Sequence, residues 1–261
     1  MEEQRNQRRR DFLKTASIGS LLLMGAPQIL SAATGQALTS AAVSASAKIT
    51  LSQDDIILFQ GDSITDSGRK RDNSEPNNSA ALGSGYAFLA ASALLKKHAD
   101  KNLKIYNKGI SGNKVYQLAE RWDADCLEIK PTVLSILIGV NDYWHKHNGK
   151  YDGTSKKYTD DLTALLDRTR QKLPDVKLII AEPFAVKGVK AVDDTWYPEF
   201  DEYRVAAASI AKQFSAVYVP YQKVFDDAQK IAPGKYWTGD GVHPSAAGAE
   251  LMAEAWLTAV K

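Results

Sequence analysis

Five short apolar runs, separated by longer segments with helical periodicity, constrain the fold of this chain most strongly. The apolar residues of each run are continuous rather than alternating, as is typical of strands buried on both faces of a parallel sheet. The runs are DIILFQ (55–60), LKIYNKG (103–109), TVLSILIGV (132–140), VKLIIAEP (176–183) and AVYVP (216–220). Helical patterns occupy 86–99, 115–129, 158–173, 197–214, 222–231 and 245–260. We therefore predict one α/β fold, a three-layer α/β/α sandwich with a mostly parallel five-stranded sheet.

The N-terminal segment has the pattern of an export signal. RRRDFLK (8–14) precedes an apolar, small-residue stretch that ends in SAA (31–33), and this order of charged, apolar and small residues is typical of such signals. Gly and Pro interrupt the stretch, which is too short for a good membrane span. The pair Arg9-Arg10 resembles the twin-arginine motif. The alternative is an amphipathic N-terminal helix.

From this pattern we predict three parts: an export signal over 1–33, a flexible leader over 34–47 and a folded domain over 48–261. The expected partner of the signal is the twin-arginine export machinery, and the expected location is the bacterial periplasm or the cell exterior, without a stable membrane anchor. Without residues 1–33 the acidic and basic residues are equal in number. This balance argues against nucleic acid as a partner. Cys126 is the only cysteine, which excludes an internal disulfide.

Four short motifs follow predicted strands or precede the last helix. They are GDS with Ser63, GISGN with Gly112, GVND with Asn141, and DGVHP with Asp240 and His243. Each motif alone is ordinary turn chemistry. In parallel sheets, however, ligand sites lie beyond the carboxyl ends of the strands, where all four motifs would meet.

The residues of these motifs suit acyl transfer through a serine. A serine hydroxyl needs a base to take its proton, and a histidine oriented by a carboxylate can do this. Asp240 and His243 are three residues apart and could form that pair on one turn. Negative charge that develops on the attacked carbonyl needs donors, and the candidates are the N–H groups of Ser63 and Gly112 and the amide of Asn141.

These motifs resemble the blocks of the SGNH, or GDSL, hydrolases, in order and approximate spacing, from about Asp55 to the C-terminus. Ile64 replaces the family's leucine after GDS. The resemblance implies a flavodoxin-like SGNH hydrolase domain over 48–261. It also implies Ser63 as nucleophile, His243 as base, Asp240 as its orienting carboxylate, and Gly112 and Asn141 as oxyanion donors alongside Ser63.

Aromatic residues near the predicted rim are candidates for substrate contact, above all Trp144, Trp196 and Trp237. Such rings can stack on sugars, line an acyl pocket or pack as lids. His145 and His147 form an H-x-H pattern, for which a solvated loop is a better interpretation than a metal site. We expect neither a metal nor an organic cofactor.

The sequence thus predicts a secreted serine esterase that removes small acyl groups, above all acetyl, from a small-molecule or oligosaccharide ester. Its resemblance to carbohydrate acetylesterase-like members of the family favours that substrate. The alternative is a lipid or aryl-ester hydrolase, which should show an apolar cleft around Ser63. A more remote alternative is a non-catalytic carbohydrate-binding protein on a hydrolase fold.

Overall fold

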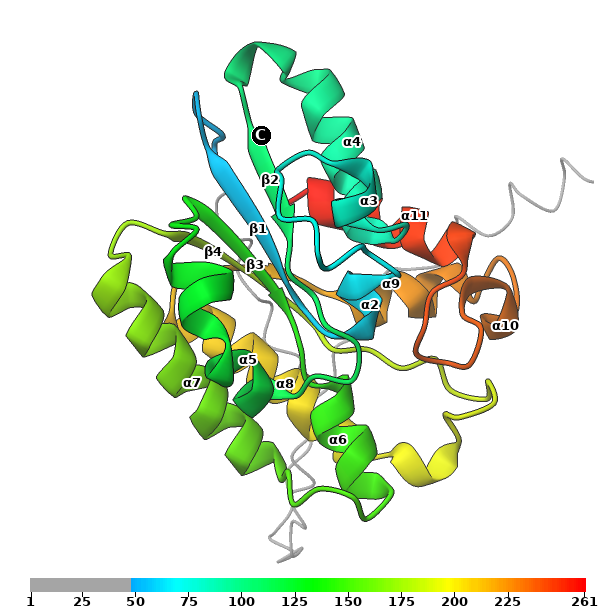
Figure 1. Ribbon diagram of the computed structural model, residues 1–261. Coiled ribbons are helices and arrows are strands. Elements are labelled where there is room, and N and C mark those ends of the chain that lie inside the picture. The colour runs from blue at the N-terminus through cyan, green and yellow to red at the C-terminus, as the bar shows by residue number, and fades with distance from the viewer. Residues whose placement is uncertain (1–47) are drawn as a thin grey trace, which may run out of the picture. The chain divides into compact units, whose positions relative to one another are not determined.

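The computed structural model describes residues 48–261, and a five-stranded parallel sheet runs through its centre (Figure 1). The strand order is β2-β1-β3-β4-β5, and every neighbouring pair is parallel. The strands are β1 (Ile56–Gly61), β2 (Lys104–Asn107), β3 (Val133–Leu137), β4 (Lys177–Ala181) and β5 (Val217–Val219). The predicted three-layer α/β fold is therefore confirmed.

The central strands are buried on both faces, as their continuous apolar sequences predicted. All five residues of β3 are buried. Its one polar side chain, Ser135, accepts a hydrogen bond of 2.9 Å from the indole N–H of Trp256. The helical layer thus supplies the hydrogen bond that a buried hydroxyl requires.

Helices cover the two faces of the sheet as separate layers. One layer contains α4 (Tyr86–Lys97), α9 (Tyr221–Ala228) and α11 (Ala246–Leu257), and the other contains α5 (Val115–Glu120), α7 (Ser155–Lys172) and α8 (Glu199–Gln213) (Figure 1). Short elements complete the fold: α2 (Ser63–Asp66), α3 (Ser79–Leu82), α6 (Val140–His147), α10 (Gly234–Trp237), the 3-10 turns η2 (Ala99–Lys101) and η4 (Asp194–Trp196), and the π-helical turn η3 (Asp123–Leu127).

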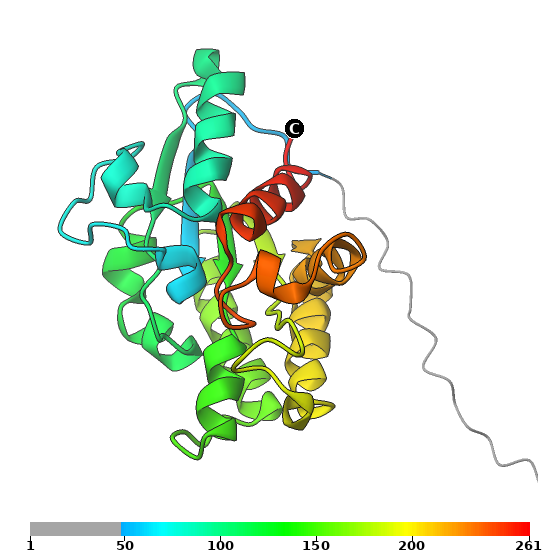
Figure 2. The same ribbon diagram turned by 90° about the vertical axis from the view of Figure 1, so that its right-hand side faces the viewer.

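The sheet order places the site. β1 lies between β2 and β3, and the chain leaves β1 for one helical layer and β2 for the other. The carboxyl end of β1 is therefore the point where the strand order reverses, where such sheets bind ligands. The helices α2 and α6 begin just beyond β1 and β3, and the turn between α10 and α11 lies beside α2 (Figure 2).

Two local predictions need correction. The helix expected over 115–129 is interrupted: α5 ends at Glu120, and the chain continues into the π-helical turn η3. The segment after β3 is the helix α6 rather than a loop, so His145 and His147 lie on a helix. His147 contacts Tyr143 and Thr195 through its two ring nitrogens, at 3.2 Å each. Tertiary packing against η4 therefore orders a segment whose sequence suggested a solvated turn.

The described residues contain no helix that is long and apolar enough to cross a membrane. Within 48–261, no group of three or more His, Cys, Asp or Glu side chains is arranged to hold a metal ion. The export signal and leader predicted over 1–47 lie outside the described residues.

Candidate active site

Ser63 is the first residue of α2, directly beyond β1. The carboxylate of Asp62 caps this short helix and accepts a hydrogen bond of 3.0 Å from the N–H of Ile64. Gly61 permits close packing of this segment against β3, because a Cβ at this position would lie 2.3 Å from the carbonyl oxygen of Leu137. The sharp turn places Ser63 at the carboxyl end of the central strand β1, where its side chain is half-buried.

The turn that carries His243 is organised by one carboxylate. Oδ1 of Asp240 accepts hydrogen bonds from the N–H groups of Val242 and His243, at 2.9 and 2.8 Å. Oδ2 of Asp240 lies 2.7 Å from Nδ1 of His243. Gly241 has φ +97°, and a Cβ there would approach Val192 to 2.6 Å. Asp240 therefore fixes the turn and the imidazole ring together.

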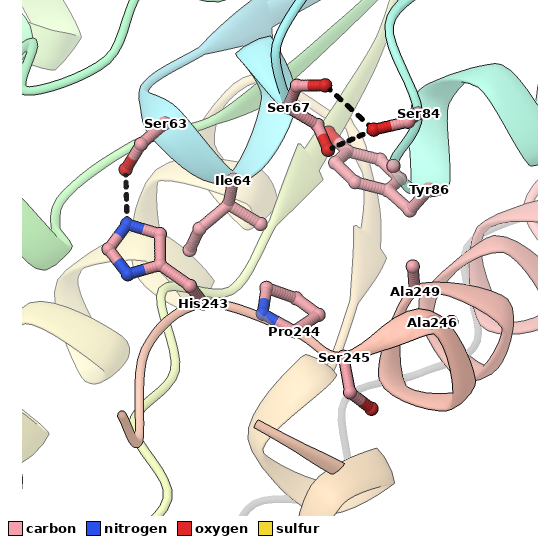
Figure 3. A pocket seen from close by; sticks show the side chains of 11 residues that line it. Ser63, Ile64, Ser67, Ser84, Tyr86, His243, Pro244, Ser245, Ala246 and Ala249 are labelled. Carbon is pink, nitrogen blue, oxygen red and sulfur yellow. Dashed lines mark hydrogen bonds between the residues drawn. The ribbon is translucent and has the colours of Figure 1, made fainter. Parts of the chain in front are cut away.

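The structure brings Ser63, His243 and Asp240 into one hydrogen-bonded chain. Oγ of Ser63 lies 2.8 Å from Nε2 of His243 (Figure 3), although the two residues are 180 positions apart. Burial opposes the ionisation of Asp240, but hydrogen bonds from the His243 N–H, the His243 ring and the Val242 N–H hold the pKa of Asp240 below its ordinary value. An ionised carboxylate at this place can fix the imidazole tautomer and stabilise the imidazolium.

Gly112 lies on the loop after β2, and hydrogen bonds hold this loop against β1 and α2. The Ile110 N–H donates to the carbonyl of Gly61 at 3.1 Å. The N–H and hydroxyl of Ser111 both donate to Oδ2 of Asp66, at 2.9 Å each. Gly112 has φ +82°, a conformation that a glycine adopts without the Cβ penalty. The loop geometry therefore accounts for glycine at this position.

Asn141, the second residue of α6, joins the same group. Its side-chain amide donates to the Asn113 carbonyl at 3.3 Å, and the next residue, Asp142, accepts from the N–H of Val115 at 3.2 Å. A side-chain amide has two N–H donors, so the bond to Asn113 leaves one free for a substrate oxygen. Asn141 and the Gly112 loop are thus connected directly.

Two arginines that the sequence did not single out also hold this loop. Arg69 donates to the Gly109 carbonyl at 2.7 Å, and Arg121 donates to the carbonyl of Lys108 at 2.8 Å and to Oδ1 of Asn113 at 2.9 Å. The dense charge in TDSGRKR (65–71), two residues after Ser63, was the available signal for Arg69. Arg121 lies on a helical segment, and nothing local distinguishes it from a solvent-exposed charge.

The aromatic candidates fall into two groups. Trp144 is half-buried, and its ring centroid lies 6.4 Å from that of His243. Trp196 and Trp237, the other two candidates for substrate contact, are buried, with 1% and 9% exposed. Trp196 packs among Tyr143, Trp144, His147 and Phe200. The indole of Trp237 turns inward and donates to the backbone carbonyls of Ala228 and Ala232.

Two buried carboxyl groups flank the site residues in the chain. Asp62 is 0% exposed and Asp142 is 1% exposed, and Oδ2 of each has no hydrogen-bond partner. Burial raises the pKa of both groups to about 7. For Asp142 the charge of Asp62 adds to this increase, and for Asp62 the hydrogen bond from Ile64 opposes it. In each carboxyl, Oδ1 accepts a hydrogen bond from a backbone N–H. Oδ2 is buried without a partner, and this burial favours the protonated form of the group.

Comparison with known proteins identifies the family to which this chain is similar. The profile of the GDSL-like Lipase/Acylhydrolase family matches residues 59–251. An acetylxylan esterase of Geobacillus stearothermophilus is 34% identical over 203 residues, which cover 77% of this chain and 91% of that protein. A multidomain esterase of Ruminococcus flavefaciens is 25% identical over 134 residues, which cover 50% of this chain and 16% of that protein.

Solved structures show the same likeness. A crystal structure from Parabacteroides merdae, of a protein named as a GDSL-like lipase, is 50% identical with a TM-score of 0.80 and covers 82% of this chain and 98% of that one. The acetylxylan esterase Axe2 from Geobacillus stearothermophilus is 31% identical with a TM-score of 0.72, covering 80% of this chain and 94% of that one. The predicted resemblance is thereby confirmed, and the chain belongs to the GDSL-like lipase/acylhydrolase family as a carboxylic ester hydrolase.

Proposed function

We propose that this protein is a serine esterase that removes acetyl groups from carbohydrate, with Ser63, His243 and Asp240 as its catalytic residues. The observation that carries the chemistry is the hydrogen-bonded chain from Ser63 through His243 to Asp240. The support for the substrate is the acetylxylan esterase that matches this chain over 91% of its own length.

The reaction proceeds through an acyl-enzyme. His243 takes the proton of Ser63 as Oγ attacks the ester carbonyl, and the new oxyanion is bound by the N–H groups of Ser63 and Gly112 and by the Asn141 amide. The imidazolium then returns its proton to the departing alcohol oxygen as the C–O bond breaks. Water, deprotonated by His243, attacks the acetyl-serine, and Ser63 leaves with that proton, so that acetate is released and the enzyme is restored.

The relatives support these roles. Solved structures of Axe2 include catalytic mutants of a serine, an aspartate and a histidine. The aspartate and histidine of that esterase are three positions apart, which is the spacing of Asp240 and His243. Of the three tryptophans predicted to contact the substrate, Trp144 is half-buried beside His243 and stays a candidate for that contact.

A lipid or aryl-ester hydrolase is the second candidate function. It is favoured by the 50% identity to the Parabacteroides merdae protein named as a GDSL-like lipase. The two functions differ in the acyl group that the enzyme prefers, so a chain-length series separates them.

The test is acetate release from an acetylated xylo-oligosaccharide by the purified protein, together with hydrolysis of p-nitrophenyl esters of increasing acyl length. We expect acetate release and a preference for the acetyl ester. No acetate from the oligosaccharide, combined with a preference for long acyl chains, would favour the second function instead.

We further propose that residues 1–33 are a twin-arginine export signal, that 34–47 are a leader, and that the hydrolase domain of residues 48–261 acts in the bacterial periplasm or outside the cell. The support is the RRRDFLK pattern and the apolar stretch after it. Replacing both Arg9 and Arg10 by lysine should leave uncleaved precursor inside the cell, detectable by fractionation. Normal export of that variant would exclude the twin-arginine route.

A further inference from the structure

A cavity of about 460 Å³ opens directly beside Ser63 and His243 (Figure 3). One wall is formed by Ser67 at the end of α2 and by Ser84 and Gly85 before α4, and the opposite wall by Pro244, Ala246 and Ala249. Its volume lies within the range of small-molecule sites. An acetyl group alone needs far less space.

The position of the cavity indicates which half of the ester it holds. His243 and Pro244 line it, whereas Gly112 and Asn141, which we assign to the carbonyl oxygen, do not. In hydrolysis through a serine, the histidine gives its proton to the leaving alcohol. The alcohol half must therefore lie against His243, on the side where the cavity opens.

Two serine hydroxyls give this cavity its polar wall. Ser84 Oγ donates to the carbonyl of Ser67 at 3.0 Å, and the two Oγ atoms are 3.4 Å apart. Because the Ser84 proton is directed to that carbonyl, Ser67 is the donor in the contact between the two Oγ atoms, and both hydroxyls keep lone pairs that can accept hydrogen bonds from a ligand. Two such acceptors match the hydroxyl groups of a sugar ring, which can donate to them, and the alanine and proline side chains opposite match its C–H face.

The backbone at Ser67 favours a different residue. Ser67 is left-handed, with φ 40° and ψ 46°, where glycine would avoid the strain of a Cβ. Gly85 makes room for this side chain, since a Cβ at residue 85 would lie 2.7 Å from both Cβ and Oγ of Ser67. The chain thus holds a serine where its local conformation favours glycine, and a glycine where the serine needs space.

We propose that this cavity is the subsite for the alcohol half of the ester, that it takes a sugar ring, and that Ser67 and Ser84 bind hydroxyl groups next to the esterified one. This inference rests on the proposed carbohydrate esterase function and makes it specific, because it names residues that select the alcohol rather than the acyl group.

The test keeps the acyl group constant and varies the alcohol. For each variant, kcat/KM is measured on a monoacetate of methyl β-xyloside and on ethyl acetate, whose alcohol half carries no further hydroxyl group to bond to Ser67. Ser67→Gly should lower the ratio of the two values about three- to tenfold, the loss of one neutral hydrogen bond. Its melting temperature should be unchanged or higher, because glycine relieves the left-handed strain. A purely structural role for Ser67 would not combine these two results.

A second variant does not depend on hydrogen bonding. Ala246 is the exposed first residue of α11, so Ala246→Phe should fold and fill the cavity, lowering the same ratio by at least about tenfold. The matched control is Ser92→Ala on α4, which removes an exposed serine hydroxyl that bonds only the Phe88 carbonyl. This control should leave the ratio unchanged.

Three results would overturn the proposal. The first is an unchanged ratio in both Ser67→Gly and Ala246→Phe. The second is a change confined to the ratio of ethyl hexanoate to ethyl acetate, which would place the acyl chain in the cavity. The third is a wild-type enzyme that cleaves ethyl acetate but not the acetylated glycoside, which would also remove the proposed substrate. In the first two results the wild-type enzyme still cleaves the acetylated glycoside, so they are distinguishable from a failure of the proposed carbohydrate esterase function.

Discussion

Aspartates lie next to the proposed catalytic residues in two regions of the molecule, and the pKa of the carboxyl group is shifted in opposite directions in these regions. At the ends of β1 and β3, Asp62 and Asp142 are fully buried, and burial raises the pKa of each to about 7. On the turn before α11, the side chain of Asp240 is 30% exposed, and its hydrogen bonds hold its pKa below the ordinary value. The same residue type is therefore shifted toward the protonated form in one region and toward the ionised form in the other.

This difference in pKa corresponds to two roles: Asp62 and Asp142 position the backbone, whereas Asp240 takes part in the proposed reaction. Asp62 and Asp142 each use one oxygen to fix a backbone N–H beside Ser63 or near the Gly112 loop, a task that needs an acceptor but no charge. Asp240 faces the imidazole of His243 at 2.7 Å, where a negative charge stabilises the imidazolium that forms during the reaction. Variants that keep the acceptor and remove the charge should therefore affect the two regions differently.

The largest effect is expected at Ser63, which joins the two regions. Ser63→Ala removes the nucleophile and should lower kcat by about 10⁴–10⁶-fold, with a melting temperature close to that of the wild type because the side chain is only half-buried. The measurement is ester hydrolysis by the purified variant, with thermal unfolding as the control. Retention of most of the wild-type rate would end the nucleophile assignment.

Asp240→Asn should have the next largest effect. Asparagine keeps an acceptor for the N–H groups of Val242 and His243, so the turn persists, but the charge beside the imidazole is lost. We expect kcat at pH 7 to fall by about 10⁴-fold. Asp62→Asn also keeps its acceptor, for the N–H of Ile64, and should reduce kcat by no more than about tenfold. Equal losses in kcat from two folded variants would contradict the proposed contrast.

Asn141 and Asp142 test the contrast within one motif. If the Asn141 amide binds the oxyanion, Asn141→Ala should lower kcat by about 10²–10³-fold, or about 2.7–4 kcal/mol, with little change in KM. Asn141→Asp should be at least as damaging, since it opposes the developing charge. Asp142→Asn should be milder in rate. An Asn141→Ala protein with a lower melting temperature and near-normal kcat would make Asn141 a structural residue only.

Much of this architecture could be predicted from sequence because its causes are local. Strands such as β3 are continuous apolar runs, and the motif residues stand at strand ends, where a parallel sheet gathers them. Asp240 and His243 are close in the chain, so their pairing on one turn was predictable as well.

The remaining features depend on distant partners. Trp237 donates to carbonyls of Ala228 and Ala232 in a packing arrangement that no periodicity encodes, and Trp196 is buried by residues of α6 and α8. Ser67 meets Ser84, which lies 17 positions further along the chain. The cavity and the buried state of Asp62 and Asp142 likewise exist only after the layers have packed.

The smallest expected effect concerns stability rather than rate, and it tests the buried carboxyls directly. Between the ordinary pKa of Asp62, 3.8, and its raised value of about 7, the folded protein holds a proton that the unfolded chain has released. The contribution of Asp62 to the free energy of unfolding therefore falls as pH rises through this range, by up to about 1.4 kcal/mol per pH unit. Asp62→Asn removes this contribution and should reduce the fall between pH 5 and pH 7 by about 1–3 kcal/mol in urea titrations. Asp142→Asn should act in the same direction.

The matched control is Asp227→Asn, because hydrogen bonds from Lys223 and Lys230 lower the pKa of this exposed carboxyl to about 2. Asp227 is therefore ionised throughout the range, and the stability curve of the variant should run parallel to that of the wild type. Parallel curves for Asp62→Asn as well would show that Asp62 is ionised in the folded protein, and the contrast between the two regions would then rest on burial without a difference in charge.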